Sequence, residues 1–216
     1  MKKYHLSIIV ATILIIANCS TAPPTRTNKE SSIIAINIFL QAHTSLLTLD
    51  SFQPEKIYFI KIEDGNELKA NKVIASNYCT KSWNPGPARY TVYLMGAEPG
   101  KYAAVAASGV GHGSKNTMMV LFPEKVINSS IVMLQPKSIA YMGHFYLTTG
   151  KLINGMEGAD ELQKYYHTLI FRSFGRAIAP QERETYNSEE FRKEFIKSKA
   201  SEFKNTEWQE VFNQNK

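Results

Sequence analysis

The chain has 216 residues, 44% of them hydrophobic, and a formal net charge of +6. This length is sufficient for one well-buried core with an appendage. The basic residues are spread evenly along the sequence, so the positive charge is not gathered into the basic stripe that is typical of nucleic-acid binding. We therefore expect a globular protein without a nucleic-acid partner.

The first 18 residues are predicted to be an export signal. Lys2 and Lys3 give the start a positive charge, and an unbroken run of apolar and small residues follows from Leu6 to Ala17. A run of this length is too short for a membrane-spanning helix, and its basic flank is typical of a signal peptide. Removal of residues 1–18 takes away two lysines and lowers the formal net charge from +6 to +4.

The last residues of this segment and the next one read Ile16-Ala17-Asn18-Cys19 and resemble the lipobox of bacterial lipoproteins. The resemblance implies that the chain is cut before Cys19 and that acyl chains such as palmitate anchor Cys19 in a lipid bilayer. Asn18 departs from the Gly, Ala or Ser that is usual there, and an ordinary secretory signal is the alternative interpretation. In the same family an Asp after the cysteine favours inner-membrane retention, so Ser20 implies the outer membrane.

Residues 19–32 are predicted to form a disordered tether. After Cys19 they contain two prolines, many hydroxyl side chains and no hydrophobic side chain larger than alanine, a composition that cannot bury a core. Roughly 12 such residues at about 3.3 Å each reach about 40 Å when fully extended. If Cys19 is acylated, Cys79 has no partner cysteine, so we expect a buried thiol in a protein without disulfides.

Residues 33–149 are predicted to form a β-sandwich domain. Hydrophobic residues alternate with other residues in several short runs, such as Ile34, Ile36, Ile38 and Leu40. About eight such runs are separated by turn signals, including Asn84-Pro85-Gly86-Pro87 and Glu98-Pro99-Gly100-Lys101. Many short strands with close turns favour an antiparallel β-sandwich. The fold class that we expect is therefore mainly β, an antiparallel β-sandwich with a helical C-terminal extension.

Residues 150–216 are predicted to form a hinge and an α-helical C-terminal extension. The glycine-rich residues 150–158 precede a helical pattern over 160–171, a second over 188 to about 204, and a short one after Thr206. Asn187 is expected to cap the second helix, with Glu190 reaching back to it. The apolar stripes on these helices are typical of faces that pack on a core.

The hairpin between Tyr93 and Tyr102 is the strongest local motif. Pro99 and Gly100 suit the two central positions of a type II turn between paired strands. This Pro-Gly-x-Tyr hairpin, followed by small residues, resembles the transthyretin or carboxypeptidase-regulatory type of β-sandwich. Together with residues 138–147 and 160–166, it is also similar to uncharacterised bacterial envelope lipoproteins. The resemblance implies a fold and a location but no catalytic residue, because such sandwiches serve mainly as binding or accessory modules.

No catalytic, cofactor-binding or metal-binding residue is predicted. The glycine-rich residues 109–115 lack the spacing of a phosphate-binding loop, and no Gly-x-Ser-x-Gly elbow is present. The histidines that remain after signal removal lie far apart without metal-ligand spacing: His43, His112, His144 and His167. We expect no cofactor and no enzymatic activity; the alternative is a hydrolase of envelope polymers whose site is assembled from loops.

Two loop residues, Trp83 and His112, are the predicted contacts for a ligand or partner. Loops held at their bases by strands are natural contact surfaces, although aromatic side chains there could instead close the end of the sandwich. We therefore expect a membrane-anchored envelope lipoprotein that acts as a non-enzymatic binding or structural module. Its expected partners are the lipid bilayer, through acylated Cys19, and an envelope protein or glycan.

Overall fold

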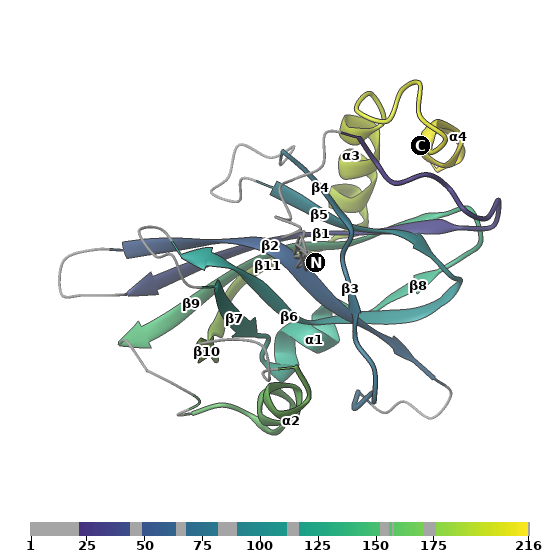
Figure 1. Cartoon of the computed structure of the whole chain (residues 1–216). Helices are drawn as coiled ribbons and strands as arrows, with labels where there is room; N and C mark the ends of the chain where they lie inside the picture. Colours follow the sequence, from purple (N-terminus) through teal and green to yellow (C-terminus); the bar gives the residue numbers. More distant parts are fainter. Residues whose placement is uncertain are drawn as a thin grey trace, which may run out of the picture.

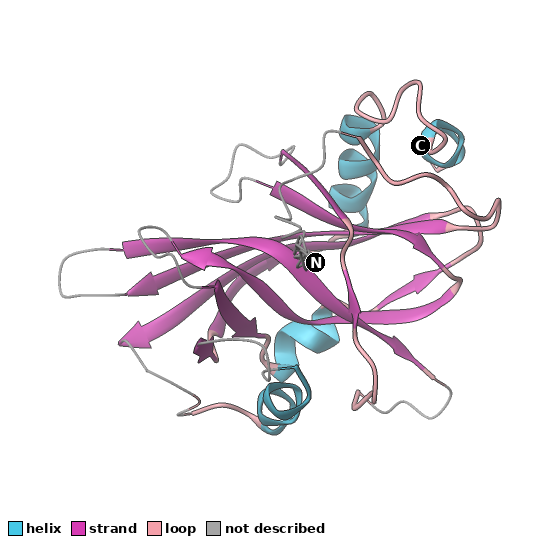
Figure 2. Cartoon of the chain, viewed as in Figure 1, coloured by secondary structure: helices cyan, strands magenta, loops and turns pink. Residues whose placement is uncertain are grey.

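The computed structural model describes residues 22–43, 49–63, 68–81, 90–111, 117–151, 156, 158–170 and 176–215. Within these ranges the protein is mainly β and sandwich-like, which confirms the predicted fold class (Figures 1 and 2). The strands are β1 Ser32–His43, β2 Leu49–Ile62, β3 Ile74–Ala75, β4 Tyr78–Lys81, β5 Tyr90–Ala97, β6 Gly100–Gly111, β7 Thr117–Leu121, β8 Val132–Leu134, β9 Ile139–Lys151, β10 Arg176–Ile178 and β11 Gln181–Tyr186. The helices are α1 Glu124–Ser129, α2 Glu161–Ile170, α3 Glu189–Lys199 and α4 Gln209–Gln214.

Strand β1 joins the two halves of the sheet network. Along one edge it pairs with β9 over most of its length. Along its other edge, Ser32 to Ile36 pair with β5, whereas Leu40 to His43 pair with β2. Because one edge of β1 is shared between two neighbours, β5 and β2 diverge from it. The sheet therefore splits into the order β4-β5-β1 on one side and β1-β2-β6-β7-β10 on the other.

Two strand pairs are parallel, whereas the sequence predicted an antiparallel sandwich. The pairs are β1 with β9 and β7 with β10. Parallel neighbours need a long connection between them, and the chain between β1 and β9 contains strands β2 to β8. Alternation within a strand reports which face is buried and carries no information on strand direction, so the sequence pattern could not reveal these two pairs.

Two hydrophobic clusters lie on opposite faces of β1. Ile34 and Ile36 belong to the larger cluster, which includes residues of α1 and α2. Ile33 and Ala35 belong to the smaller cluster, which includes residues of α3 and α4. Successive side chains of a strand point to opposite faces, so the run of hydrophobic residues in β1 is buried on both sides. Figure 2 shows α1 and α2 on one side of the strands and α3 and α4 on the other.

The C-terminal region contains strands as well as the predicted helices. Helices α2, α3 and α4 fall in the three predicted helical segments. However, β10 pairs with β7 and β11 pairs with β9, so residues 176–186 extend the sheets instead of forming part of a purely helical extension. Helix α1 also lies before the expected end of the sandwich. The sequence of β11, QERETY, is polar and largely exposed, so it lacks the hydrophobic alternation that predicts strands.

The tether predicted at residues 19–32 is not free over the part that the structure describes. Residues 22–31, called the N-terminal strap below, pass beside α4 before β1 begins at Ser32 (Figure 1). The indole nitrogen of Trp208 donates a hydrogen bond of 2.7 Å to the carbonyl oxygen of Pro24. The low hydrophobicity of the strap gives no sign of these contacts, because they are made by the Pro24 carbonyl and by the backbone N–H and the side chain of Arg26.

Among the described residues, no helix is long and apolar enough to cross a membrane.

Candidate functional site

The residues predicted to carry function lie outside the described residues. These are the acylation candidate Cys19 and the contact candidates Trp83 and His112. Their prediction therefore rests on the sequence alone.

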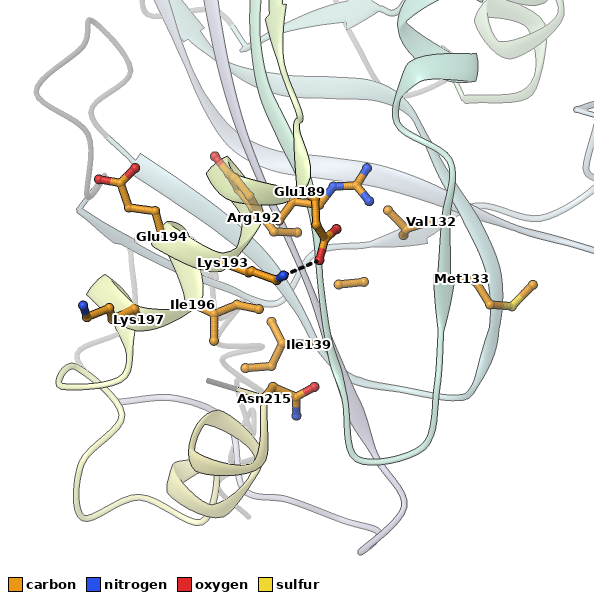
Figure 3. Close-up of a pocket in the computed structure, with 12 residues that line it drawn as sticks. Val132, Met133, Ile139, Glu189, Arg192, Lys193, Glu194, Ile196, Lys197 and Asn215 are labelled. Atoms are coloured by element: carbon orange, nitrogen blue, oxygen red, sulfur yellow. Dashed lines mark ion pairs between the residues drawn. The ribbon is translucent and has the colours of Figure 1, made fainter.

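A groove lies between α3 and the neighbouring strands (Figure 3). Its volume is about 710 Å³, which is within the range of about 300–1,000 Å³ that small-molecule sites occupy. The groove is lined by residues of β8 and β9 on one side and of α3 on the other, with Asn215 after α4. They are Val132, Met133, Ile139, Ala140, Tyr141, Glu189, Arg192, Lys193, Glu194, Ile196, Lys197 and Asn215.

The groove combines an apolar base with a charged rim. Ile139 and Ile196 are buried, whereas Met133 has an exposed fraction of 60% and is the most exposed large hydrophobic side chain described. On the rim, Lys193 Nζ lies 3.9 Å from Glu189 Oε1 (Figure 3). Such an exposed ion pair contributes about 0–1 kcal/mol to stability, so these charges are available to a ligand at little cost.

Arg192 is the least satisfied charged group of the groove. Its side chain extends from α3 toward Val132 (Figure 3). Within the described structure, its Nε atom is buried and has no hydrogen-bond partner. A buried donor without a partner carries a desolvation penalty. An acceptor on a ligand, or an ordered water, would relieve that penalty.

A chain of partly buried hydrogen bonds lies beneath the C-terminal half of α3. The Lys199 ammonium donates to Thr80 Oγ1 at 3.1 Å and to Glu202 Oε1 at 2.6 Å. Thr80 Oγ1 is in turn 3.2 Å from the hydroxyl oxygen of Tyr93. Burial lowers the pKa of Lys199, and the Glu202 carboxylate opposes that shift. Burial also raises the pKa of Tyr93 well above its ordinary value.

The same chain of hydrogen bonds continues to β1 and β9. Asn37 Nδ2 donates to Thr91 Oγ1 at 3.1 Å, and the Tyr141 hydroxyl donates to Asn37 Oδ1 at 2.7 Å. The Tyr141 ring stacks on Phe195 of α3 with ring centroids 3.8 Å apart. Asn37, Thr91 and Tyr141 are buried, so a substrate would not reach them. This network therefore fixes α3 on the sheet rather than forming a reaction centre.

His144 is a buried titratable group that the sequence did not single out. Its side chain is fully buried on β9, and within the described structure neither ring nitrogen has a hydrogen-bond partner. The ring stacks on Tyr146 with centroids 4.6 Å apart. Burial lowers the pKa of His144 to about 4, so the imidazole is neutral at pH 7. Because the imidazole has no access to solvent, it does not act as a general base. Its protonation instead affects the stability of the fold.

Cys79 differs from the prediction of an unpaired thiol. It is disulfide-bonded. Its side chain is only 7% exposed and belongs to the larger hydrophobic cluster. Sequence spacing could not reveal this bond, because pairing depends on distances in the folded chain.

The described residues contain no group of three or more His, Cys, Asp or Glu side chains that could hold a metal ion. Comparison of the chain with protein-family models, with curated proteins and with solved structures found no match. The groove, the buried network and the N-terminal strap are therefore the features from which a function can be argued.

Proposed function

We propose that the protein is a bacterial envelope lipoprotein, anchored in a membrane through acylated Cys19, that acts as a non-enzymatic binding or structural module. The observation that carries the proposal is the basic start, the apolar run and the ending Ile16-Ala17-Asn18-Cys19. Secreted chains with this arrangement are typically anchored rather than released. Ser20 favours the outer membrane over the inner one.

The binding role is supported by the chemistry of the groove. An apolar base with a few polar groups around it is the usual composition of a ligand site, and the groove combines Ile139 and Ile196 with the charged side chains of α3. The polar groups beneath α3 are engaged with one another. The predicted loop contacts Trp83 and His112 are the other candidates for partner contact.

Site-specific photo-crosslinking in intact cells tests the binding role. A photoreactive residue replacing Met133 places the probe in the groove, and one replacing Thr168 on the exposed side of α2 is the matched control. We expect a discrete crosslinked product from position 133 and none from position 168. Equal products from both positions would contradict a specific groove. Turnover of a peptidoglycan, glycan or ester substrate by the purified protein would refute the non-enzymatic proposal.

Disulfide formation would compete with acylation for the sulfur of Cys19. The sequence contains two cysteines, and Cys79 is disulfide-bonded. One sulfur cannot hold both an acylglyceryl group and a disulfide, so an acylated Cys19 cannot be the disulfide partner of Cys79. Removal of the acyl anchor by Cys19→Ala is expected to move the protein from the detergent phase to the aqueous phase, or to leave an unprocessed precursor. A Cys79→Ala variant is expected to stay in the detergent phase.

A further inference from the structure

We propose that the N-terminal strap holds the α4 side of the protein directly against a lipid headgroup surface. The proposal rests on acylation of Cys19 under the proposed function, and it adds the orientation of the protein on the membrane. A free tether would let the protein turn in any direction. A strap that is bound to α4 allows only the α4 side of the protein to face the membrane.

The strap is bound to α4 by a cluster around Trp208. Trp208 has an exposed fraction of 1%, and its indole N–H donates to the Pro24 carbonyl at 2.7 Å. The Arg26 guanidinium lies 5.7 Å from the centre of the Trp208 ring. An arginine at this distance is attracted to the face of an indole ring. Pro24 and Arg26 of the strap therefore both contact Trp208.

Charged groups strengthen the same contact. The backbone N–H of Arg26 donates to Glu207 Oε2 at 2.5 Å, and its guanidinium lies 3.8 Å from Glu210 Oε2. The guanidinium also donates to the carbonyl oxygens of Lys29 and Ser31. The Arg26 side chain is only 9% exposed, whereas that of Glu210 is 67% exposed, so solvent partly screens the Arg26–Glu210 ion pair. Arg26 thus links the C-terminal end of the strap to Glu210 on α4 and to Glu207 just before α4.

The chain between the anchor and the bound strap is short. Ala22 is the first described residue, three residues after Cys19. Three residues at up to about 3.6 Å each span at most about 11 Å. The free tether predicted from the sequence would have allowed about 40 Å. With acyl chains on Cys19 in the bilayer, the start of the strap lies close to the headgroup layer, which is about 5–8 Å thick on each side.

The surface around α4 is polar and carries charges of both signs. Its exposed side chains include Asn213 and Gln214 on α4, Lys29 on the strap and Lys204 on the turn before α4, together with the carboxylates of Glu207 and Glu210. Amides and lysines hydrogen-bond to headgroup phosphates, whereas carboxylates are repelled by anionic lipids, so the orientation follows from the short chain to Cys19 and not from the charge of this surface. Helix α2 lies on the other side of the strands from α3 and α4 (Figure 2). It is therefore the membrane-distal reference.

Depth-dependent quenching tests the orientation on the full acylated protein. In a Cys79→Ala background, Gln214→Cys and Thr168→Cys each receive an environment-insensitive fluorophore. The protein is reconstituted into vesicles of phosphatidylethanolamine and phosphatidylglycerol that contain a lipid with a nitroxide on its headgroup. We expect the fluorophore at position 214 to lose most of its fluorescence and the fluorophore at position 168 to lose little.

Variants of the strap separate its role from simple tethering. Arg26→Ala removes the contacts with Trp208 and Glu210, and Lys29→Ala removes one positive charge from an exposed strap residue. We expect quenching at position 214 to fall in Arg26→Ala and to persist in Lys29→Ala. Trp208→Phe, which keeps the aromatic packing and removes the bond to Pro24, is expected to lower quenching to an intermediate level.

The outcomes distinguish the two proposals. A protein that does not float with the vesicles and whose mass lacks acyl chains refutes the proposed function itself. A protein that floats and is acylated, but shows equal quenching at positions 214 and 168, overturns only the orientation. Unchanged quenching in both Arg26→Ala and Trp208→Phe would also overturn it, because the strap would then not be what orients the protein.

Discussion

Replacing His144 by phenylalanine is expected to remove a loss of stability that occurs when the pH falls. His144 is fully buried, and burial lowers its pKa to about 4, whereas a histidine in an unfolded chain has a pKa of about 6.5. Phenylalanine keeps a ring against Tyr146 and removes two nitrogens that have no partner in the described structure. We therefore expect the variant at pH 7 to be as stable as the wild type, or more stable by up to about 1 kcal/mol.

The sign of the pH effect follows from the two pKa values of His144. The folded-state pKa lies below the unfolded-state pKa, so the unfolded chain binds more protons between pH 6.5 and pH 4. Stability is therefore lost as the pH falls through this window. With 1.36 kcal/mol per pKa unit, His144 costs the folded state about 1 kcal/mol at pH 6, about 2 kcal/mol at pH 5 and about 3 kcal/mol at pH 4.

Urea unfolding of the wild type and His144→Phe at pH 7, 6, 5 and 4, in the same buffer and detergent, measures this contribution. Carboxylates that titrate in the same range affect both proteins equally, so the difference between the two unfolding free energies isolates His144. We expect that difference to grow as the pH is lowered. Unfolding free energies that fall in parallel from pH 7 to pH 4 would refute the argument that His144 is buried without a partner.

Three further substitutions test close packing and hydrogen bonding in the sheets, each by urea or thermal unfolding at pH 7. Gly143→Ala is expected to destabilise the protein by more than about 2 kcal/mol, since its Cβ would lie 2.7 Å from Asn187 Cβ at a φ of +126°. Gly96→Ala, with a φ of +83° and no atom within 4 Å of its Cβ, is expected to cost only about 1 kcal/mol; equal losses would contradict the close approach. Tyr141→Phe is expected to cost about 1–2 kcal/mol, because Asn37 loses the 2.7 Å hydrogen bond from the Tyr141 hydroxyl, and no loss of stability would argue against the buried network.

Much of the fold could be predicted from local patterns. The alternation in β1 predicted a strand, and the helical spacing of hydrophobic residues predicted α2 and α3. The predicted cap of α3 was wrong by one residue. Ser188, rather than Asn187, accepts the hydrogen bond from Phe191 N at 3.2 Å. Asn187 instead donates to the Ser129 carbonyl, a contact between residues 58 positions apart that no local pattern reports.

The elements that the sequence missed depend on contacts across the fold. The polar strand β11 exists because it pairs with β9. The strap is ordered because Pro24 and Arg26 contact Trp208, more than 180 residues later. The candidate groove could not be predicted from the sequence for the same reason. The groove brings residues 132–141, 189–197 and 215 together, and only the folded chain places these segments side by side. By contrast, the acylation motif at Cys19 is contiguous and can be recognised from sequence.

Intact-mass analysis of the protein extracted from cell membranes, with alkylation of free thiols before and after reduction, tests the central proposal most directly. We predict a chain that begins at Cys19 and carries the added mass of acyl chains on that residue. A mature chain with unmodified Cys19, or one in which both cysteines become alkylatable only after reduction, would contradict membrane anchoring through Cys19.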